Sequence, residues 1–419
     1  MNRSLKSCSA TMLMVILLSF FVRSAWAVDV QMIGDVNVSG DMTATSFTGS
    51  GVGLTGIPGT AISSTSITVN QLADDAVTST KIANDAVTPA KIAFYSRLAI
   101  VATSGGDYNN PATAMTNYST WCASTPCLLK IMPGVYDVGT TAVQMQSNID
   151  IEGSGEGVTI ITGMNGSGLT GVVRGANSTE LRHITIQHAG SVNSAVGIYN
   201  SFVSPTMSNV TVRVSGGIYN YGVYNTSSAL KMTNVTTSAT GTNTNYAVYN
   251  SQCTRAMTMT NVSATSLQGA WNFGVYNNSA SPVMTDVDAT SIGGTESYGV
   301  YNVSSSPLMI NVRAVASGAV SNYGIYNNSS APDMTRVQTS GNTGTYSYGL
   351  YNSASSGTYT IYIDQSSFEG VPNSIYNDTE YTLYIGASKL RGPVNSVGTY
   401  HCVGVYAGTT YTALGANCQ

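Results

Sequence analysis

A four-residue phrase recurs eight times between residues 197 and 377, and its spacing constrains the fold more than any other feature of the sequence. The phrase is Gly-Val-Tyr-Asn or a close variant, and its successive tyrosines are separated by 25, 25, 27, 25, 25, 25 and 25 residues. These tyrosines are Tyr199, Tyr224, Tyr249, Tyr276, Tyr301, Tyr326, Tyr351 and Tyr376. A fixed period of this length is typical of a solenoid, in which each repeat buries its apolar side against its neighbours.

The composition of the repeat indicates that the solenoid is built from strands. Val, Tyr, Thr, Ser, Asn and Gly dominate it, and these residues favour strands and turns over helix interiors. Two apolar columns keep the same step. They are Met207, Met232, Met259, Met284, Met309 and Met334, and Val210, Val235, Val262, Val287, Val312 and Val337. The sequence therefore predicts an all-β chain, a parallel β-helix with one rung per repeat of 25 residues.

Side chains alternate between the two faces of a strand, so the phrase should place Val and Asn on one face and Tyr and Gly on the other. We expect Val, Met and Asn to point inward, with stacked Asn amides hydrogen-bonded from rung to rung, and Tyr to point outward. A second aromatic column lies three residues before the tyrosines and falls, by the same parity, on the opposite face. It comprises Tyr221, Tyr246, Phe273, Tyr298, Tyr323 and Tyr348.

Residues 1–27 have the features of a secretory signal, with a basic start, a short apolar run and a small-residue cleavage site ending at Ala27. The apolar run is too short to span a membrane. We therefore expect secretion or display at the cell surface, without membrane insertion. Loss of Arg3, Lys6 and Arg23 leaves 13 of the 16 basic residues against 20 acidic ones. That balance argues against nucleic acid as a partner.

Five cysteines remain in the exported chain. Cys122 and Cys127 are close enough in sequence to form a disulfide, as are Cys402 and Cys418, and export permits such bonds. Neither pair has a second Cys or His pair nearby, so we expect no metal site there. Cys253 is left over, in the one repeat with two extra residues. It is either a buried or solvent-exposed thiol or half of an intermolecular disulfide.

Residues 28–92 follow a different pattern. From residue 53 onward, ten-residue units carry an apolar residue at their fifth and tenth places, which is too few to build a core within one chain. Several copies wrapped together can build one. The Ala-Val-Thr-x-x-Lys-Ile units resemble the shaft segments of bacteriophage tail fibres. Such shafts are trimeric, so the resemblance implies a homotrimer formed through residues 28–92. The alternative is a disordered linker.

The segment that follows is expected to cap and start the coil. Residues 112–122 are the best candidate for a short helix, with Asn110 as its N-cap and Pro111 in its first turn. A helix at the open end would cover unpaired strand edges, which otherwise promote aggregation.

Two strand-turn-strand motifs come next, with Pro-Gly-Val-Tyr at 133–136 and Glu-Gly-Ser-Gly at 152–155. They resemble the opening rungs of the pectate lyase and pectin methylesterase superfamily, and the likeness spans about residues 98–418. Members of this superfamily are right-handed parallel β-helices, so the resemblance implies that fold here.

Together these patterns predict five parts. They are a signal peptide at 1–27, an extended oligomerisation shaft at 28–92, a capping helix with the first rungs at 93–190, the regular β-helix at 191–378, and closing rungs with a disulfide-closed cap at 379–419.

The active-site motifs of pectin methylesterases, polygalacturonases and pectate lyases do not occur in the sequence. The nearest constellation is Asp286 and Asp288 beside Arg313 and Arg336. Asp288 and Arg313 share a column in successive rungs, so we expect them one strand spacing apart. One interpretation is a calcium-and-arginine site for an acidic polysaccharide. The other is a rung-to-rung ion pair, and it implies no cofactor.

The outward tyrosines, Tyr199, Tyr224, Tyr249, Tyr276, Tyr301, Tyr326 and Tyr351, are the candidate binding residues. We expect them to form an exposed aromatic stripe, a surface on which sugar rings stack and which often marks a partner site. The alternatives are that the rings pair with each other and stiffen the rod, or that they pack against a second subunit.

Two functions from different classes follow. The preferred one is a non-catalytic exported surface or fibre protein, adhesin-like, which displays repeated surface to a glycan or polysaccharide. Near-identical rungs favour it, because a catalytic site would require a few rungs to depart from the pattern with clustered polar residues. The alternative is a polysaccharide lyase or hydrolase of the pectate lyase-like superfamily with an atypical site, and only this alternative calls for calcium.

Overall fold

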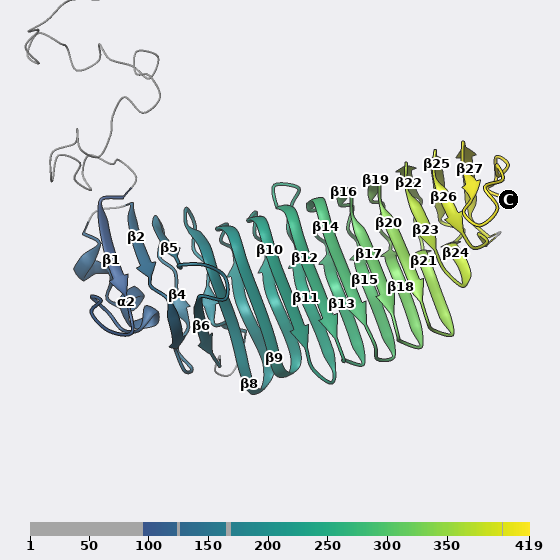
Figure 1. Ribbon diagram of the computed structural model, residues 1–419. Coiled ribbons are helices and arrows are strands. Elements are labelled where there is room, and N and C mark those ends of the chain that lie inside the picture. The colour runs from purple at the N-terminus through teal and green to yellow at the C-terminus, as the bar shows by residue number, and fades with distance from the viewer. Residues whose placement is uncertain (1–94, 124–125, 165–168, 396) are drawn as a thin grey trace, which may run out of the picture. The chain divides into compact units, whose positions relative to one another are not determined.

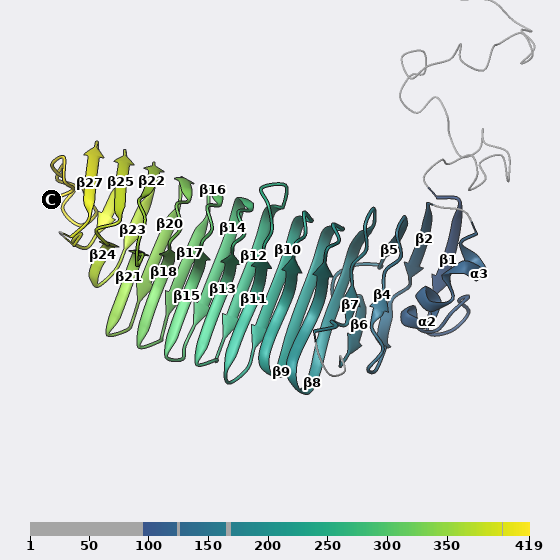
Figure 2. The same ribbon diagram turned by 180° about the vertical axis from the view of Figure 1, so that it is seen from behind.

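A computed structural model of the chain describes residues 95–123, 126–164, 169–395 and 397–419 (Figures 1 and 2). The chain divides into two compact units, residues 1–81 and 82–419, and every described residue belongs to the second. The predicted signal peptide and shaft, residues 1–27 and 28–92, lie outside the described residues. The segment boundaries proposed from the sequence stay predictions.

The described chain is an all-β solenoid in which each strand pairs in parallel with its counterpart in the next rung (Figure 1). The strands stack into three faces. Face 1 contains β1 (Arg97–Val101), β2 (Cys127–Ile131), β5 (Ile149–Glu152), the starts of β8 (Glu180–Ser201), β9 (Thr206–Thr226), β10 (Lys231–Thr240), β12 (Thr258–Leu267) and β14 (Val283–Ile292), then β16 (Leu308–Ile310), β19 (Asp333–Thr335), β22 (Tyr359–Asp364), β25 (Tyr381–Gly386) and β27 (Thr399–Val403).

Faces 2 and 3 are built in the same way. Face 2 contains β3 (Gly134–Asp137), β6 (Thr159–Gly163), the middle of β8 and β9, the ends of β10, β12 and β14, then β17 (Arg313–Ser317), β20 (Gln338–Asn342), β23 (Ser367–Glu369), β26 (Lys389–Arg391) and β28 (Tyr406–Ala407). Face 3 contains β4 (Val143–Gln144), β7 (Val173–Arg174), the ends of β8 and β9, then β11 (Thr244–Ser251), β13 (Trp271–Asn278), β15 (Glu296–Val303), β18 (Ser321–Asn328), β21 (Tyr346–Ser353) and β24 (Pro372–Asn377).

The predicted columns are confirmed by the register. Tyr249 pairs with Tyr276, and Met232 pairs with Met259, although two extra residues separate these rungs in sequence. The extra residues are accommodated between the end of β11 and the start of β12, so the pairing on either side is undisturbed.

The core of the rod is formed by the Met and Val columns, whose members are at most 2% exposed. Burying each such side chain contributes roughly 1.5–3 kcal/mol. Beside them runs the predicted amide ladder, from Asn200 to Asn377, in which each Nδ2 donates to the Oδ1 of the next rung at 2.8–3.1 Å. All eight asparagines are fully buried. The inward placement of Val, Met and Asn is therefore confirmed.

A residue in the left-handed conformation forms the corner between faces 1 and 2 in each regular rung. The corner residues are Asn209, Asn234, Asn261, Asp286, Asn311 and Arg336, with φ between 52° and 54°. Asn and Asp tolerate this conformation better than other residues with a Cβ atom. This requirement explains why Asn recurs directly before the column Val in most of these rungs.

The prediction for the second aromatic column was wrong, because the rings of Tyr221 and Tyr224 lie 5.1 Å apart on the same outer side of face 3. The alternation of side chains breaks at Gly222 and Val223, which are both buried. Gly222 therefore faces inward rather than outward as predicted. A Cβ atom added to it would lie 2.4 Å from the carbonyl oxygen of Ala247, so glycine fits this close approach.

The predicted N-terminal helical cap is present, but it is split into α2 (Pro111–Thr116) and α3 (Tyr118–Trp121). Asn110 is the N-cap, and its Oδ1 accepts hydrogen bonds from the backbone N–H groups of Ala112 and Thr113 at 2.8 and 3.2 Å. Most of α2 is buried where it packs against β1 and β4. The predicted Cys122–Cys127 disulfide then joins the end of α3 to the start of β2.

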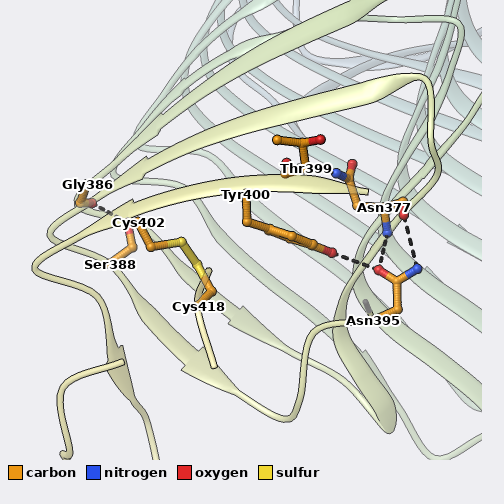
Figure 3. The surroundings of a disulfide bond; sticks show 8 residues. All are labelled: Asn377, Gly386, Ser388, Asn395, Thr399, Tyr400, Cys402 and Cys418. Carbon is orange, nitrogen blue, oxygen red and sulfur yellow. Dashed lines mark hydrogen bonds between the residues drawn. A yellow bond between two sulfur atoms is a disulfide. The ribbon is translucent and has the colours of Figure 1, made fainter. Parts of the chain in front are cut away.

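At the other end, the chain after β27 folds back over the last rung (Figure 3). The predicted disulfide between Cys402 and Cys418 is present, and the Cys402 N–H donates to the Ala416 carbonyl at 2.8 Å. Asn395 closes the amide ladder, since its Nδ2 donates to the Asn377 carbonyl at 3.0 Å and its Oδ1 accepts from the Tyr400 hydroxyl at 2.7 Å. The tail thus pairs with groups that an open end would leave exposed.

Candidate functional site

The aromatic residues of face 3 form two adjacent rows, which we call the aromatic double row. The first row contains the eight tyrosines of the repeated phrase, with ring centroids 4.4–5.4 Å apart from one rung to the next. The second row runs from Tyr221 to Tyr348, with spacings of 4.8–5.6 Å. At the N-terminal end, the Arg174 guanidinium lies over the Tyr199 ring, 5.9 Å from its centroid.

The tyrosines of the first row are half-buried, rather than fully exposed on a flat sheet. Phe273 and Tyr298 in the second row are only 7% exposed. Burial, together with charge interactions with the neighbouring tyrosines, raises the pKa of Tyr224 and Tyr276 to about 12. Rings in successive rungs contact one another, as one of the sequence-based alternatives expects, and their role in stiffening the rod stays a prediction. The role of Tyr199 to Tyr351 in binding stays a prediction.

Asp288 and Arg313 pair in register on β14 and β17, as predicted, and Arg313 Nη1 lies 3.0 and 2.9 Å from the two carboxylate oxygens. Their side chains are 46% and 52% exposed, and such ion pairs contribute ~0–1 kcal/mol. Asp286 accepts a hydrogen bond from Asn311 in the next rung. Arg336 is the corner residue of the rung after Asn311, so Asn311 separates it from Asp286 in the corner column.

A shallow hollow of 270 Å³ lies over Asp286, Asp288 and Arg313. Each of the two carboxylates has a partner in the next rung, which is the arrangement of a rung-to-rung polar ladder. Any catalytic role of these three residues stays a prediction.

The largest charged cluster of the described residues was missed by the sequence reasoning. It lies on face 1 near the N-terminal cap, where Arg182 lies 2.6 Å from Glu152 and 2.7 Å from Glu180, and Lys130 lies 2.6 Å from Glu152. Lys130, Glu152 and Arg182 occupy one column. They are 22 and 30 residues apart in sequence, so the column could be found only after the irregular first rungs had been aligned.

Each charge in this cluster lies near a charge of opposite sign, and Arg182 also lies 3.6 Å from Asp150. Burial opposes ionisation of Glu152, but hydrogen bonds and charge interactions with Lys130 and Arg182 outweigh it and lower the pKa of that carboxyl group. Burial likewise opposes the charge of Arg182, yet its bonds to Tyr95, Glu152 and Glu180 raise the pKa of the guanidinium above its ordinary value. The cluster is therefore a partly buried ion network that ties the first rungs together.

A second feature missed from the sequence is a hollow of 510 Å³ on face 1, near the C-terminal end. It lies over β19, β22, β25 and β27, and Tyr362, Tyr384 and His401 form its aromatic wall. The signal in the sequence is the pair Tyr362 and Tyr384, which are 22 residues apart rather than 25.

Cys253 is a buried thiol, 3% exposed, whose Sγ donates to the Ser251 carbonyl at 3.3 Å. Burial raises its pKa. The structure places Cys253 as a buried thiol, and the intermolecular disulfide stays a prediction. Within the described ranges, no group of three or more His, Cys, Asp or Glu residues is arranged to hold a metal ion. No helix in the described part of the chain is long and apolar enough to cross a membrane.

No protein-family model matches the chain, and no curated protein matches it in sequence. Several solved structures are similar in fold. ORF18 of Geobacillus virus E2 is 12% identical, with a TM-score of 0.39, and the match covers 67% of this chain and 51% of that one. The gp42 tailspike of Acinetobacter phage vb_AbaP_AS12 is 11% identical, with a TM-score of 0.46 and coverage of 76% and 66%. Pectin methylesterase from carrot is 14% identical, with a TM-score of 0.31 and coverage of 75% and 88%.

This chain spans about half of the first viral protein and about two thirds of the tailspike. Identities below 25% and TM-scores below 0.5 restrict these likenesses to the fold. The parallel register of the chain's own strands shows a parallel β-helix.

Proposed function

We propose that this chain is a non-catalytic, exported surface or fibre protein of the adhesin type that binds glycans. The observation that carries the proposal is the regularity of the coil. From β9 to β21, each rung places the same kinds of side chain at the same positions, including a continuous aromatic double row on face 3. Such a surface suits a repeating ligand.

Three acidic residues of the regular rungs support a non-catalytic role, because each of them has a hydrogen-bond or ion-pair partner within the coil. Asp288 pairs with Arg313, Asp286 accepts from Asn311, and the Glu296 carboxylate accepts from the Tyr298 hydroxyl. The first two contacts connect a carboxylate to the next rung, and the third places the Glu296 carboxylate beside the buried Tyr298 ring.

Export is supported by the two disulfides, which are typical of proteins in oxidising compartments. Signal cleavage after Ala27 and trimer formation through residues 28–92 are part of the proposal and rest on the sequence. Sedimentation velocity of the mature chain should give three times the mass of one chain. A monomer at all accessible concentrations would contradict the trimer.

The function is tested by two assays on the same preparation of the exported protein. A glycan array should show binding to a defined set of glycans. Incubation with acidic polysaccharides, with and without calcium, should release neither unsaturated nor reducing ends. Chain cleavage that is lost in Asp288→Ala would establish the lyase or hydrolase instead.

A further inference from the structure

The aromatic wall of the hollow on face 1 is a stack of three rings that begins abruptly. Asp333, Tyr362, Tyr384 and His401 occupy one column in successive strands β19, β22, β25 and β27. The Tyr362 and Tyr384 ring centroids lie 5.4 Å apart at an interplanar angle of 21°, and those of Tyr384 and His401 lie 4.6 Å apart at 18°. Tyr362 is therefore the first ring of the stack.

The first ring has a free face because the column changes residue type at β19. The place that a preceding ring would fill is taken by Asp333, whose short side chain cannot cover Tyr362. Tyr362 is accordingly 57% exposed, more than any ring of the aromatic double row, and Tyr384 is 43% exposed. The hollow of 510 Å³ opens against these rings, and its volume is within the range of small-molecule sites.

Two carboxylates lie beside the rings in the lining of the hollow. Asp333 and Asp364 both line it, two positions apart in the register of β19 and β22. Gly386 follows Asp364 in its column, and a Cβ atom placed there would lie 3.0 Å from Asp364 Oδ1, so glycine leaves that oxygen accessible. Arg255 lies 3.8 Å from Asp333 Oδ2 and partly offsets the charge of that carboxylate. Both carboxylates offer hydrogen-bond acceptors to the hollow, and Asp364 adds a negative charge.

We propose that this hollow binds one uncharged or amino-substituted sugar unit of a glycan, with the sugar ring on the free face of Tyr362. The apolar C–H face of a pyranose packs on an aromatic ring, and its hydroxyl or amino groups donate to Asp333 and Asp364. A uronic acid or sulfated sugar is disfavoured, because its negative charge would lie near the Asp364 carboxylate. The inference rests on the proposed glycan-binding function and adds a binding place on face 1, apart from the aromatic double row of face 3, with the class of sugar that it takes.

The test uses the full exported chain and five probes: cellohexaose, maltohexaose, chitohexaose, a chitosan hexamer and hexagalacturonate. Calorimetry or biolayer interferometry should show binding to at least one of the first four and weaker or no binding to hexagalacturonate. Tyr362→Ala should reduce the affinity for the best probe at least tenfold, whereas Tyr362→Phe should retain it, because the ring face is kept. Asp364→Asn should weaken binding of the chitosan hexamer most, because its amines lose a charged acceptor.

Tyr118→Ala is the matched control, since Tyr118 is an exposed tyrosine of α3, outside both the hollow and the aromatic double row. It should bind like the unmodified chain. Unchanged binding by Tyr362→Ala, or preference for hexagalacturonate, would overturn this inference and leave the proposed function standing. Failure of the unmodified chain to bind any glycan, in this panel and on the array, would overturn the proposed function itself.

Discussion

At the scale of single residues, the interior of this rod depends on polar groups that satisfy each other between rungs. Between the two ends of the ladder, each buried asparagine donates to one neighbouring amide and accepts from the other, so two partners depend on it. A buried amide left without a partner costs about 1–3 kcal/mol. The ladder therefore specifies the register of the coil as well as stabilising it.

Asn302→Ala should lower the free energy of unfolding by about 2–4 kcal/mol, because it leaves the Asn277 Nδ2 and the Asn327 Oδ1 buried without their partners. Asn278→Ala is the control, since Asn278 follows the ladder residue of its own rung but lies half-buried on the outside. Chemical denaturation of both variants compares the two positions. An equal loss of unfolding free energy in both variants would show that the amide ladder does not contribute to stability beyond an ordinary surface asparagine.

The tyrosine hydroxyls give the rod a predictable response to alkali. Burial holds the pKa of Tyr224, Tyr276 and Tyr323 at about 12 in the folded chain, against an ordinary value of 10. The folded state therefore keeps protons that the unfolded state loses between pH 10 and 12. The stability contributed by the neutral hydroxyls is complete below pH 10 and is lost as the pH rises through that window.

We accordingly expect the melting temperature to fall steeply above pH 10. Tyrosinate absorbance from Tyr224, Tyr276 and Tyr323 should rise only near pH 12 or together with unfolding. A single titration near pH 10 in a chain that remains folded would contradict the burial of the double row.

At the scale of elements, the ends of the coil matter more than any one rung, because an open rung exposes unpaired strand edges. The tail after β27 is held over the last rung by the Cys402–Cys418 disulfide and by the hydrogen bond that the Cys402 N–H donates to the Ala416 carbonyl. Two short helices, α2 and α3, cover the other end.

Replacing both Cys402 and Cys418 by Ser should cost about 3 kcal/mol of stability, the value expected for a closed loop of this size. Aggregation should also rise, because the freed tail uncovers the edge of β27. Cys253→Ser is the control: it removes a sulfur without opening a disulfide, and the equivalent position is Ser228 one rung earlier. Comparable aggregation of both variants would indicate that the tail does not protect the edge.

The strands also show which side-chain positions the sequence pattern predicts. The period and the strand alternation predicted the Met, Val and Asn columns correctly, because those residues lie in unbroken strands. Alternation failed for Tyr221, since two successive residues, Gly222 and Val223, both face inward. A bend of this kind depends on the close approach of Gly222 to Ala247 in the next rung, which no local pattern reveals.

For the molecule as a whole, the seven intervals between tyrosines were enough to predict a parallel β-helix. The charged network around Arg182 and the hollow beside Tyr362 could not be predicted, because both lie where the period is irregular and depend on alignment between rungs of unequal length. The regular middle of the rod provides repeated surface, while its less regular ends carry the individual features.

The central claim is that equivalent residues lie one strand spacing apart along a single axis. Spin labels at Ser208→Cys and at either Ile310→Cys or Thr335→Cys test it, because these positions share one face 1 column, four and five rungs apart. Pulsed electron resonance should give distances of roughly 19 and 24 Å, which differ by about one spacing of 4.8 Å. Distances that do not increase by one such step per repeat would contradict the stacked coil.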